Sequence, residues 1–228
     1  MWNKIEPIAY IRTDFPEKFG IPRQSGLIEE LKGKIVFEKE YRSREGFRGL
    51  DEFDYVWLLW GFSMNHERPF NATVKPPRLG GNKRMGVFAT RSPYHPNNIG
   101  LSCVKLEKIE MDEKDGPVLY VAGVDLMDET PIYDIKPYLP YADSHPDARS
   151  GFAGEVGGAK LKVIFPKELL DNYPKEKQRA AVALLEQDPR PAYQKDPDRQ
   201  YGVSFAGYDI HFKVREEVLT VVELVSLP

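Results

Sequence analysis

The sequence predicts a mainly β protein, with an all-β N-terminal domain of about 140 residues and a smaller α+β domain behind it. Before residue 165 the chain consists of short segments rich in β-branched and aromatic residues, separated by Gly, Pro, Asn or Asp. A small-polar, Gly-rich stretch at 141–158 then marks a linker or an exposed loop. Short strands at this spacing favour a small barrel or a sandwich over alternating strand–helix units.

The N-terminal strands follow from alternating polarity and from turn residues. We expect them at 5–13, 33–41, 55–62, 84–91, 102–111 and 117–126. The sequence EKDGP at 113–117 predicts a hairpin turn between the last two. Cys103, the single cysteine, is expected at an inward strand position as a small buried hydrophobe.

The C-terminal domain begins with a strand-like segment at 159–165. A helix is expected over 175–187, because good helix formers lie between Pro174 and Pro189. Two further strand segments, 201–214 and 218–225, close the chain.

Composition and charge narrow the function classes. Hydrophobic residues make up 41% and charged residues 29% of the 228 residues, as in soluble globular proteins. No apolar run approaches the roughly 20 residues that span a bilayer, and the first residues lack a signal-peptide core, so we expect a cytoplasmic protein. One cysteine excludes an internal disulfide and a cysteine-built zinc site.

The net charge of −3 hides a strong asymmetry. Residues 68–106 contain seven basic side chains and no acidic one, whereas residues 107–155 contain twelve acidic and four basic ones. Such a basic stretch suits phosphate or nucleic acid, although a solvated basic face gives the same pattern.

Common catalytic motifs are missing from the sequence. No G-x-G-x-x-G or G-x-S-x-G occurs, and GGNKRMG at 80–86 lacks the Lys-Ser/Thr pair of a phosphate loop. The four histidines have no metal-site spacing, so we expect no metal.

Four loops instead concentrate polar residues among Pro and Gly, at 20–26, 89–100, 125–141 and 187–194. Proline restricts the free loop and so holds neighbouring side chains ready for a ligand. Together the loops predict a composite binding site. The third loop carries most of the carboxylates, which fit either turn chemistry, a site for a sugar hydroxyl or an amine, or a Mg²⁺ site.

Four motifs carry a resemblance to a known family. They are PRQSG (22–26), VKPPRLGGNKRMGVFATRSPYHPNNIG (74–100), DETPIYDIKPYLPYADS (128–144) and DPRPAY (188–193). In this order, over nearly the whole chain, the sequence resembles the TsaA/TrmO-like family. Characterised members are S-adenosylmethionine-dependent tRNA methyltransferases that act on the exocyclic nitrogen of threonylcarbamoyladenosine beside the anticodon.

The resemblance implies a single-sheet β-barrel domain over 1–145 that binds S-adenosylmethionine, and an α+β domain over 146–228 that contacts tRNA. It also implies a homodimer with the cofactor near the subunit interface. The implied cofactor contacts are Pro22, Arg23, Gln24, Ser63, Met64, Arg91, Leu101, Asp125, Leu126, Met127 and Asp128.

Chemical roles can be assigned to these positions. Arg23 or Arg91 suits the cofactor carboxylate, because a planar guanidinium matches carboxylate geometry. Asp125 or Asp128 suits the ribose hydroxyls or the ammonium group, and Gln24 suits the adenine edge.

The reaction suggests further residues. The target nitrogen is a poor nucleophile, so a base would help, and Asp134 and Tyr138, beside Lys136, are the candidates. Arg84, Arg190 and Tyr193 are expected to contact the anticodon stem-loop through phosphates and unstacked bases.

Two positions depart from the family pattern, because His95 stands where Arg is common and Asn98 where Pro is common. A phosphate contact at His95 would be weaker and pH-dependent. An alternative function is therefore a non-catalytic RNA- or nucleotide-binding barrel that retains the cofactor pocket. A metal-dependent hydrolase that uses the Asp cluster is a third hypothesis.

Overall fold

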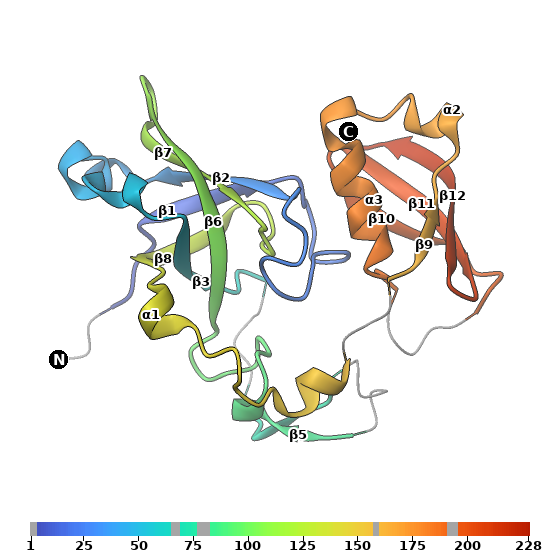
Figure 1. Ribbon diagram of the computed structural model, residues 1–228, viewed down its shortest axis with the longest axis horizontal. Helices are drawn as coiled ribbons and strands as arrows, with labels where there is room; N and C mark the ends of the chain where they lie inside the picture. The colour runs from blue at the N-terminus through green and yellow to red at the C-terminus, as the bar shows by residue number, and fades with distance from the viewer. Residues whose placement is uncertain (1–3, 65–68, 77–82, 157–159, 191–195) are drawn as a thin grey trace.

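A computed structural model describes residues 4–64, 69–76, 83–156, 160–190 and 196–228. Figure 1 shows a β-barrel that contains the N-terminal half of the chain, and beside it a second sheet with helices on one face. The mainly β prediction is therefore confirmed, with a closed barrel and not a sandwich in the first part.

The barrel is one closed sheet of antiparallel strands in the order β1-β2-β7-β6-β3-β8. Its strands are β1 (Ala9–Thr13), β2 (Lys32–Phe37), β3 (Tyr55–Gly61), β6 (Ile99–Asp112), β7 (Gly116–Ala122) and β8 (Thr130–Pro137). The expected hairpin turn joins β6 to β7, with Gly116 at φ 69°.

Alternation of side chains fills the barrel interior. Ile11 of β1, Ile35 of β2, Leu58 of β3 and Ile132 of β8 are completely buried, and Val104 of β6 lies in the same core. Because successive strand residues point to opposite faces, these positions alternate with more exposed ones.

Three expectations are wrong in detail. The segment expected as a strand at 84–91 contains only β5 (Met85–Gly86), which pairs with β4 (Thr73–Val74), followed by a 3-10 turn at Val87–Ala89. The loop expected at 125–141 contains β8, the strand that closes the barrel. Pro131 is tolerated because it lies at the start of that strand.

The third wrong expectation concerns which residues of β6 point into the barrel. Ser102, not Cys103, is fully buried, and it shares the inner face with Val104. Cys103 is only partly buried, and burial raises the pKa of its thiol.

The C-terminal part is an α+β unit, as expected. Its sheet has the order β10-β11-β12-β9, in which only the β12–β9 pair is parallel. The strands are β9 (Lys162–Ile164), β10 (Tyr201–Phe205), β11 (Tyr208–Arg215) and β12 (Val218–Ser226). The segment expected at 201–214 is thus a hairpin that turns at Ala206 and Gly207, both with positive φ.

Short helices complete the fold. They are α1 (Pro140–Asp143), α2 (Lys167–Leu170) and α3 (Gln178–Glu186), with 3-10 turns at Lys39–Tyr41, Arg44–Phe47, Leu50–Glu52, Gly151–Val156 and Lys175–Lys177. The helix expected over 175–187 is therefore a 3-10 turn that runs into α3. No helix in these described ranges is long and apolar enough to cross a membrane.

The two parts pack directly against each other. Phe15, which follows β1, lies against Phe205 of β10 with 5.0 Å between ring centroids. Lys177 forms an ion pair with Asp14, whose carbonyl accepts a hydrogen bond from the Ala206 amide. Gly20 has φ 86°, and a Cβ atom there would lie 2.1 Å from Cγ2 of Val203. The loop between β1 and β2 is therefore held by the C-terminal sheet.

Candidate active site

A cavity of about 470 Å³ lies at one end of the barrel. The end of β3, the start of β6 and the start of β8 meet there, because β3 pairs antiparallel with both neighbours. The loop after β1, the loop at 90–95 and the β7–β8 connection complete the wall. This volume is within the range of roughly 300–1,000 Å³ that small-molecule sites occupy.

A buried hydrogen-bonded chain forms part of the cavity wall. Trp60 Nε1 donates to Ser102 Oγ at 2.9 Å, and Ser102 Oγ donates to Asp125 Oδ1 at 2.6 Å. The indole fits because residue 100 is glycine, where a Cβ atom would lie 2.2 Å from Trp60 Cε2. Because the hydroxyl has both an acceptor and a donor partner, the carboxylate of Asp125 is held in one orientation.

Burial governs the charge of Asp125. It raises the pKa of this carboxyl to about 6, although the Ser102 hydroxyl, nearby backbone amides and the positive charge of Arg91 act in the opposite direction. The cavity therefore holds an acceptor that is ionised at neutral pH and takes up a proton in mild acid.

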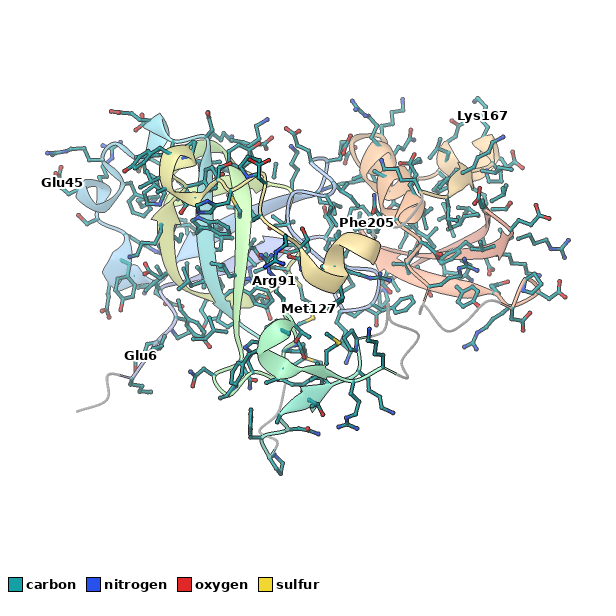
Figure 2. All side chains as sticks on the ribbon, turned by 60° about the horizontal axis from the view of Figure 1, so that its bottom comes forward. Glu6, Glu45, Arg91, Met127, Lys167 and Phe205 are labelled. Carbon is teal, nitrogen blue, oxygen red and sulfur yellow. The ribbon has the colours of Figure 1, made fainter. Side chains whose placement is uncertain are left out.

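Basic and amide groups line the same cavity as this carboxylate. Arg91 Nη1 donates to Gln24 Oε1, and Gln24 Nε2 donates to the Arg23 carbonyl at 2.5 Å. Arg91 and Arg23 are exposed at the cavity wall. Figure 2 labels Arg91 and Met127, both of which line the cavity. The arrangement provides cations for an anionic group and an anion for a hydroxyl or ammonium group.

The structure brings together nearly all positions that the family resemblance implied for the cofactor. The cavity is lined by Pro22, Arg23, Gln24, Ser63, Met64, Arg91, Leu101, Asp125, Leu126 and Met127. Asp128 is not part of this lining, since its carboxylate accepts a hydrogen bond from the Thr13 amide and pairs with Arg12 at 3.6 Å.

The three residues suggested for base catalysis do not line the cavity. Asp134 and Lys136 lie further along β8 and form an ion pair of 2.8 Å with one another. Tyr138 follows the strand and packs against Trp57, with 5.9 Å between ring centroids. Within one subunit, therefore, this cluster is separate from the hydrogen-bonded residues Trp60, Ser102 and Asp125.

The residues suggested for RNA contact are in different surroundings. Arg84 is exposed and donates from Nε to Thr73 Oγ1 at 2.8 Å. Arg190 pairs with Asp188 through two bonds of 2.8 Å, and only 12% of its side chain is exposed. A phosphate contact by Arg190 would have to replace that carboxylate. Tyr193 lies outside the described residues.

His95 and Asn98, the departures from the family pattern, belong to a tight turn. The Asn98 amide donates to the His95 carbonyl at 3.2 Å, and Asn98 has φ 49°, a region that asparagine tolerates and proline does not. His95 Nε2 lies 2.9 Å from the Thr90 carbonyl, and the ring lines the cavity. This ring nitrogen therefore interacts with the loop itself.

Sequence reasoning missed Trp60, Ser102 and Thr130, which also line or support the cavity. A signal for Ser102 existed, because a lone polar residue at an inward strand position requires a partner. As for metals, no group of three or more His, Cys, Asp or Glu suited to an ion occurs among the residues placed by the structure.

Fold and cavity together define a class, namely a closed antiparallel barrel that binds a small polar molecule at one end and lacks a glycine-rich nucleotide turn in its sequence. Residues 10–144 match the tRNA-methyltransferase O N-terminal domain, and residues 158–227 match the TrmO C-terminal domain. The chain belongs to the tRNA-methyltransferase O family.

Individual relatives agree with this assignment. The tRNA (adenine(37)-N6)-methyltransferase of Escherichia coli strain K12 is 39% identical over 221 residues, which cover 93% of this chain and 94% of that protein. The Mus musculus protein of the same name is 43% identical over 141 residues, which cover 61% of this chain and 31% of that protein. The crystal structure of TrmO from Pseudomonas aeruginosa has a TM-score of 0.79 at 32% identity and covers 99% of this chain and 100% of that chain.

Proposed function

We propose that this protein transfers a methyl group from S-adenosylmethionine to the N6 nitrogen of a tRNA adenine next to the anticodon, within threonylcarbamoyladenosine. The observation that carries the proposal is the cavity, which Arg91 and Gln24 line together with the partly buried Asp125 carboxylate. The relatives named tRNA (adenine(37)-N6)-methyltransferase support the reaction class.

The donor set fits the cofactor. S-adenosylmethionine has a carboxylate and an ammonium group at one end and a ribose diol and adenine at the other. Arg91 or Arg23 can bind the carboxylate through a planar guanidinium, and Asp125 can accept from the ammonium group or the ribose hydroxyls. Met127 and Leu101 provide apolar surface beside these groups.

The residues of the chain contribute to the reaction mainly by positioning the reactants. When bound, S-adenosylmethionine supplies an electrophilic methyl group on a sulfonium. The cavity wall holds one reactant so that the adenine nitrogen can approach in line, and such positioning supplies much of the rate. Asp125, held by Ser102, fixes the orientation of the bound group without moving a proton. A proton must leave the target nitrogen as the new bond forms, so a base would add to the rate.

For that base, Asp134 and Tyr138, beside Lys136, remain our candidates. Since they lie outside the cavity of their own chain, they serve this role only from a second subunit. The homodimer implied by the family resemblance offers that arrangement. Single-turnover rates of Asp134→Asn and Tyr138→Phe with saturating cofactor test it, and wild-type rates in both variants would rule these residues out.

The tRNA would contact the exposed Arg84, which lies beside the β4–β5 pair. Arg190 contributes only if Asp188 releases it, in which case Arg190→Ala weakens tRNA binding and leaves cofactor affinity unchanged. An unchanged RNA titration would eliminate that contact. A tRNA substrate also accords with the cytoplasmic site of action that we propose.

The experiment that tests the function uses labelled S-adenosylmethionine with tRNA that carries or lacks the threonylcarbamoyl group. We expect label transfer to the modified tRNA, with little to the unmodified one. Cofactor and tRNA binding without transfer would instead support the non-catalytic module. Arg91→Ala is the matched negative control, because it removes a cavity cation from an exposed position and so should leave the fold intact.

A further inference from the structure

Two phenylalanine side chains lie exposed next to the cavity. Phe70 precedes β4 and is 59% exposed, and Phe88 follows β5 and is 73% exposed. Their rings are stacked, with 6.3 Å between centroids and 30° between planes. Isolated exposed apolar residues are common, but two neighbouring exposed rings whose planes differ by 30° form an aromatic patch that needs a reason.

The backbone holds this pair in place. The pairing of β4 with β5 and a hydrogen bond of 2.9 Å from the Val87 amide to the Ala72 carbonyl join the two segments. On its other side Phe88 meets the edge of His95, at 5.6 Å between centroids and 84° between planes. Because His95 lines the cavity, the aromatic surface continues directly to the cavity wall.

The charge of the surroundings indicates the occupant. Within the described residues 69–76 and 83–98 there are four basic side chains and no acidic one. The basic residues are Lys75, Lys83, Arg84 and Arg91. Aromatic faces among cations are the combination that binds single-stranded nucleic acid, since bases stack on the rings and phosphates pair with the cations.

We propose that Phe70 and Phe88 form a stacking platform for an unpaired base of the RNA substrate, beside the nucleotide that enters the cavity. This inference rests on the proposed function and makes it more specific. The platform holds a neighbouring base of the anticodon loop, and it thereby positions the target adenine at the cavity mouth. Because every base has a flat face, the platform recognises an unpaired base and not its identity.

A second copy of this chain is the other occupant that an aromatic surface suits. The basic surroundings disfavour contact between this surface and the same surface of a second copy, because the two would repel one another. The second subunit proposed above would therefore reach the cavity through a different surface. The test includes this outcome.

The experiment compares full-length wild type with Phe88→Ala, Phe88→Leu, Phe88→Trp and Phe70→Ala. Each is titrated with an anticodon stem-loop RNA and with a fully paired hairpin. We expect Phe88→Ala and Phe88→Leu to weaken stem-loop binding by about 5- to 100-fold, while Phe88→Trp retains it, because stacking requires an aromatic face. Phe70→Ala should weaken binding less than Phe88→Ala, because Phe88 also contacts His95. Binding of the paired hairpin should not change.

Two controls separate stacking from damage to the fold. Tyr41→Ala removes an exposed aromatic side chain outside the cavity lining and should bind the stem-loop as wild type does. Calorimetric titration with S-adenosylmethionine should give the wild-type affinity for every Phe88 variant.

The outcomes are distinct. Equal stem-loop affinity of Phe88→Ala and wild type overturns the platform and leaves the proposed function standing. Equal binding by Phe88→Leu and wild type also overturns it, because an apolar contact would then suffice. A change of solution mass in Phe88→Ala, without a change in RNA affinity per chain, assigns the surface to a second copy. Failure of the wild type to bind or methylate tRNA overturns the proposed function and the platform together.

Discussion

The segment from Asp125 to Tyr138 places two aspartates in contrasting surroundings. Asp125 lies in the cavity wall, and its hydrogen bonds come from the neutral Ser102 hydroxyl and backbone amides. Asp134, on the outer part of β8, is paired with the ammonium group of Lys136 at 2.8 Å. The first has a raised pKa because it is desolvated, whereas the second already has a cation beside it.

This difference distinguishes a carboxylate that is available to a ligand from one whose charge is already satisfied. In the sequence both residues belong to one Asp-rich stretch, and composition alone gives them the same weight. Only the barrel separates them, since the connection before β8 lies in the cavity wall and β8 itself carries Asp134 away from it. The proposals for the two residues can therefore be tested against each other.

The largest effect is expected from Asp125→Ala. The change removes the acceptor for a cofactor ammonium or hydroxyl group, and the affinity for S-adenosylmethionine should fall by about 10- to 100-fold. Isothermal titration measures this directly, with Asp134→Ala as the matched control. If both variants bind the cofactor equally well, the distinction between the two aspartates has no functional meaning.

Ser102→Ala tests whether the cavity carboxylate depends on its buried support. The change leaves the Trp60 indole N–H without its acceptor in a position where Ser102 is 0% exposed. We expect the free energy of unfolding to fall by about 1–3 kcal/mol in urea. Ser204→Ala, which removes a surface hydrogen bond to Glu17, should cost less, and equal losses would argue against a special role for the buried chain.

The raised pKa of Asp125 predicts that cofactor affinity depends on pH, with an effect of intermediate size. A cation or hydroxyl ligand needs the ionised carboxylate, and burial raises the pKa of this group to about 6. Cofactor affinity should therefore rise by about tenfold from pH 5 to pH 8 and level off above the pKa. Titration at several pH values measures it, and Asp125→Asn should give a flat profile.

The same raised pKa gives the stability of the ligand-free protein the opposite dependence on pH. The folded-state pKa lies above the ordinary value of 3.8, so the folded state binds the proton more tightly than the unfolded state does. The contribution of Asp125 to stability is therefore greatest at low pH, and it declines as the pH rises from about 4 through about 6. A stability that rises over this interval by way of Asp125 would contradict the assignment.

Asp134→Asn should have the smallest effect. Its ion pair with Lys136 is largely solvated, and such pairs contribute about 0–1 kcal/mol to stability. We expect the unfolding free energy to change within that range and cofactor affinity to stay within about twofold of wild type. A larger loss of affinity would place Asp134 at the cofactor and so contradict its separation from the cavity.

Local pattern predicted much of the barrel. Alternation of apolar residues located β1, β2, β3, β6 and β7, because a strand buried on one face repeats every second residue. It missed β8, because Pro131, Asp134 and Pro137 interrupt the apolar alternation there. These residue types are also typical of loops. The closing strand of a barrel is defined by its two neighbours, so its own residues carry a weak signal.

The site, like the barrel, was predicted only in part from the sequence. The four loops and the family motifs pointed to Arg23, Arg91 and Asp125, which the structure places at one cavity. They did not reveal that Trp60 and Ser102 would meet, because that contact depends on the register between β3 and β6. Nor did they separate Asp134 from the cavity. Local composition identifies candidate residues, whereas their partners come from pairing between distant strands.

The close approach of Gly20 to Val203 has a consequence for how the two parts can be exchanged among relatives. Gly20 lies two residues before Pro22 in the loop that lines the cavity, and Val203 belongs to β10 of the C-terminal sheet. A chimaera that joins this barrel to another C-terminal part must keep a residue no larger than valine there. A bulkier side chain at position 203 would displace the cavity loop at Gly20, so a change in the C-terminal sheet would reach the cavity wall.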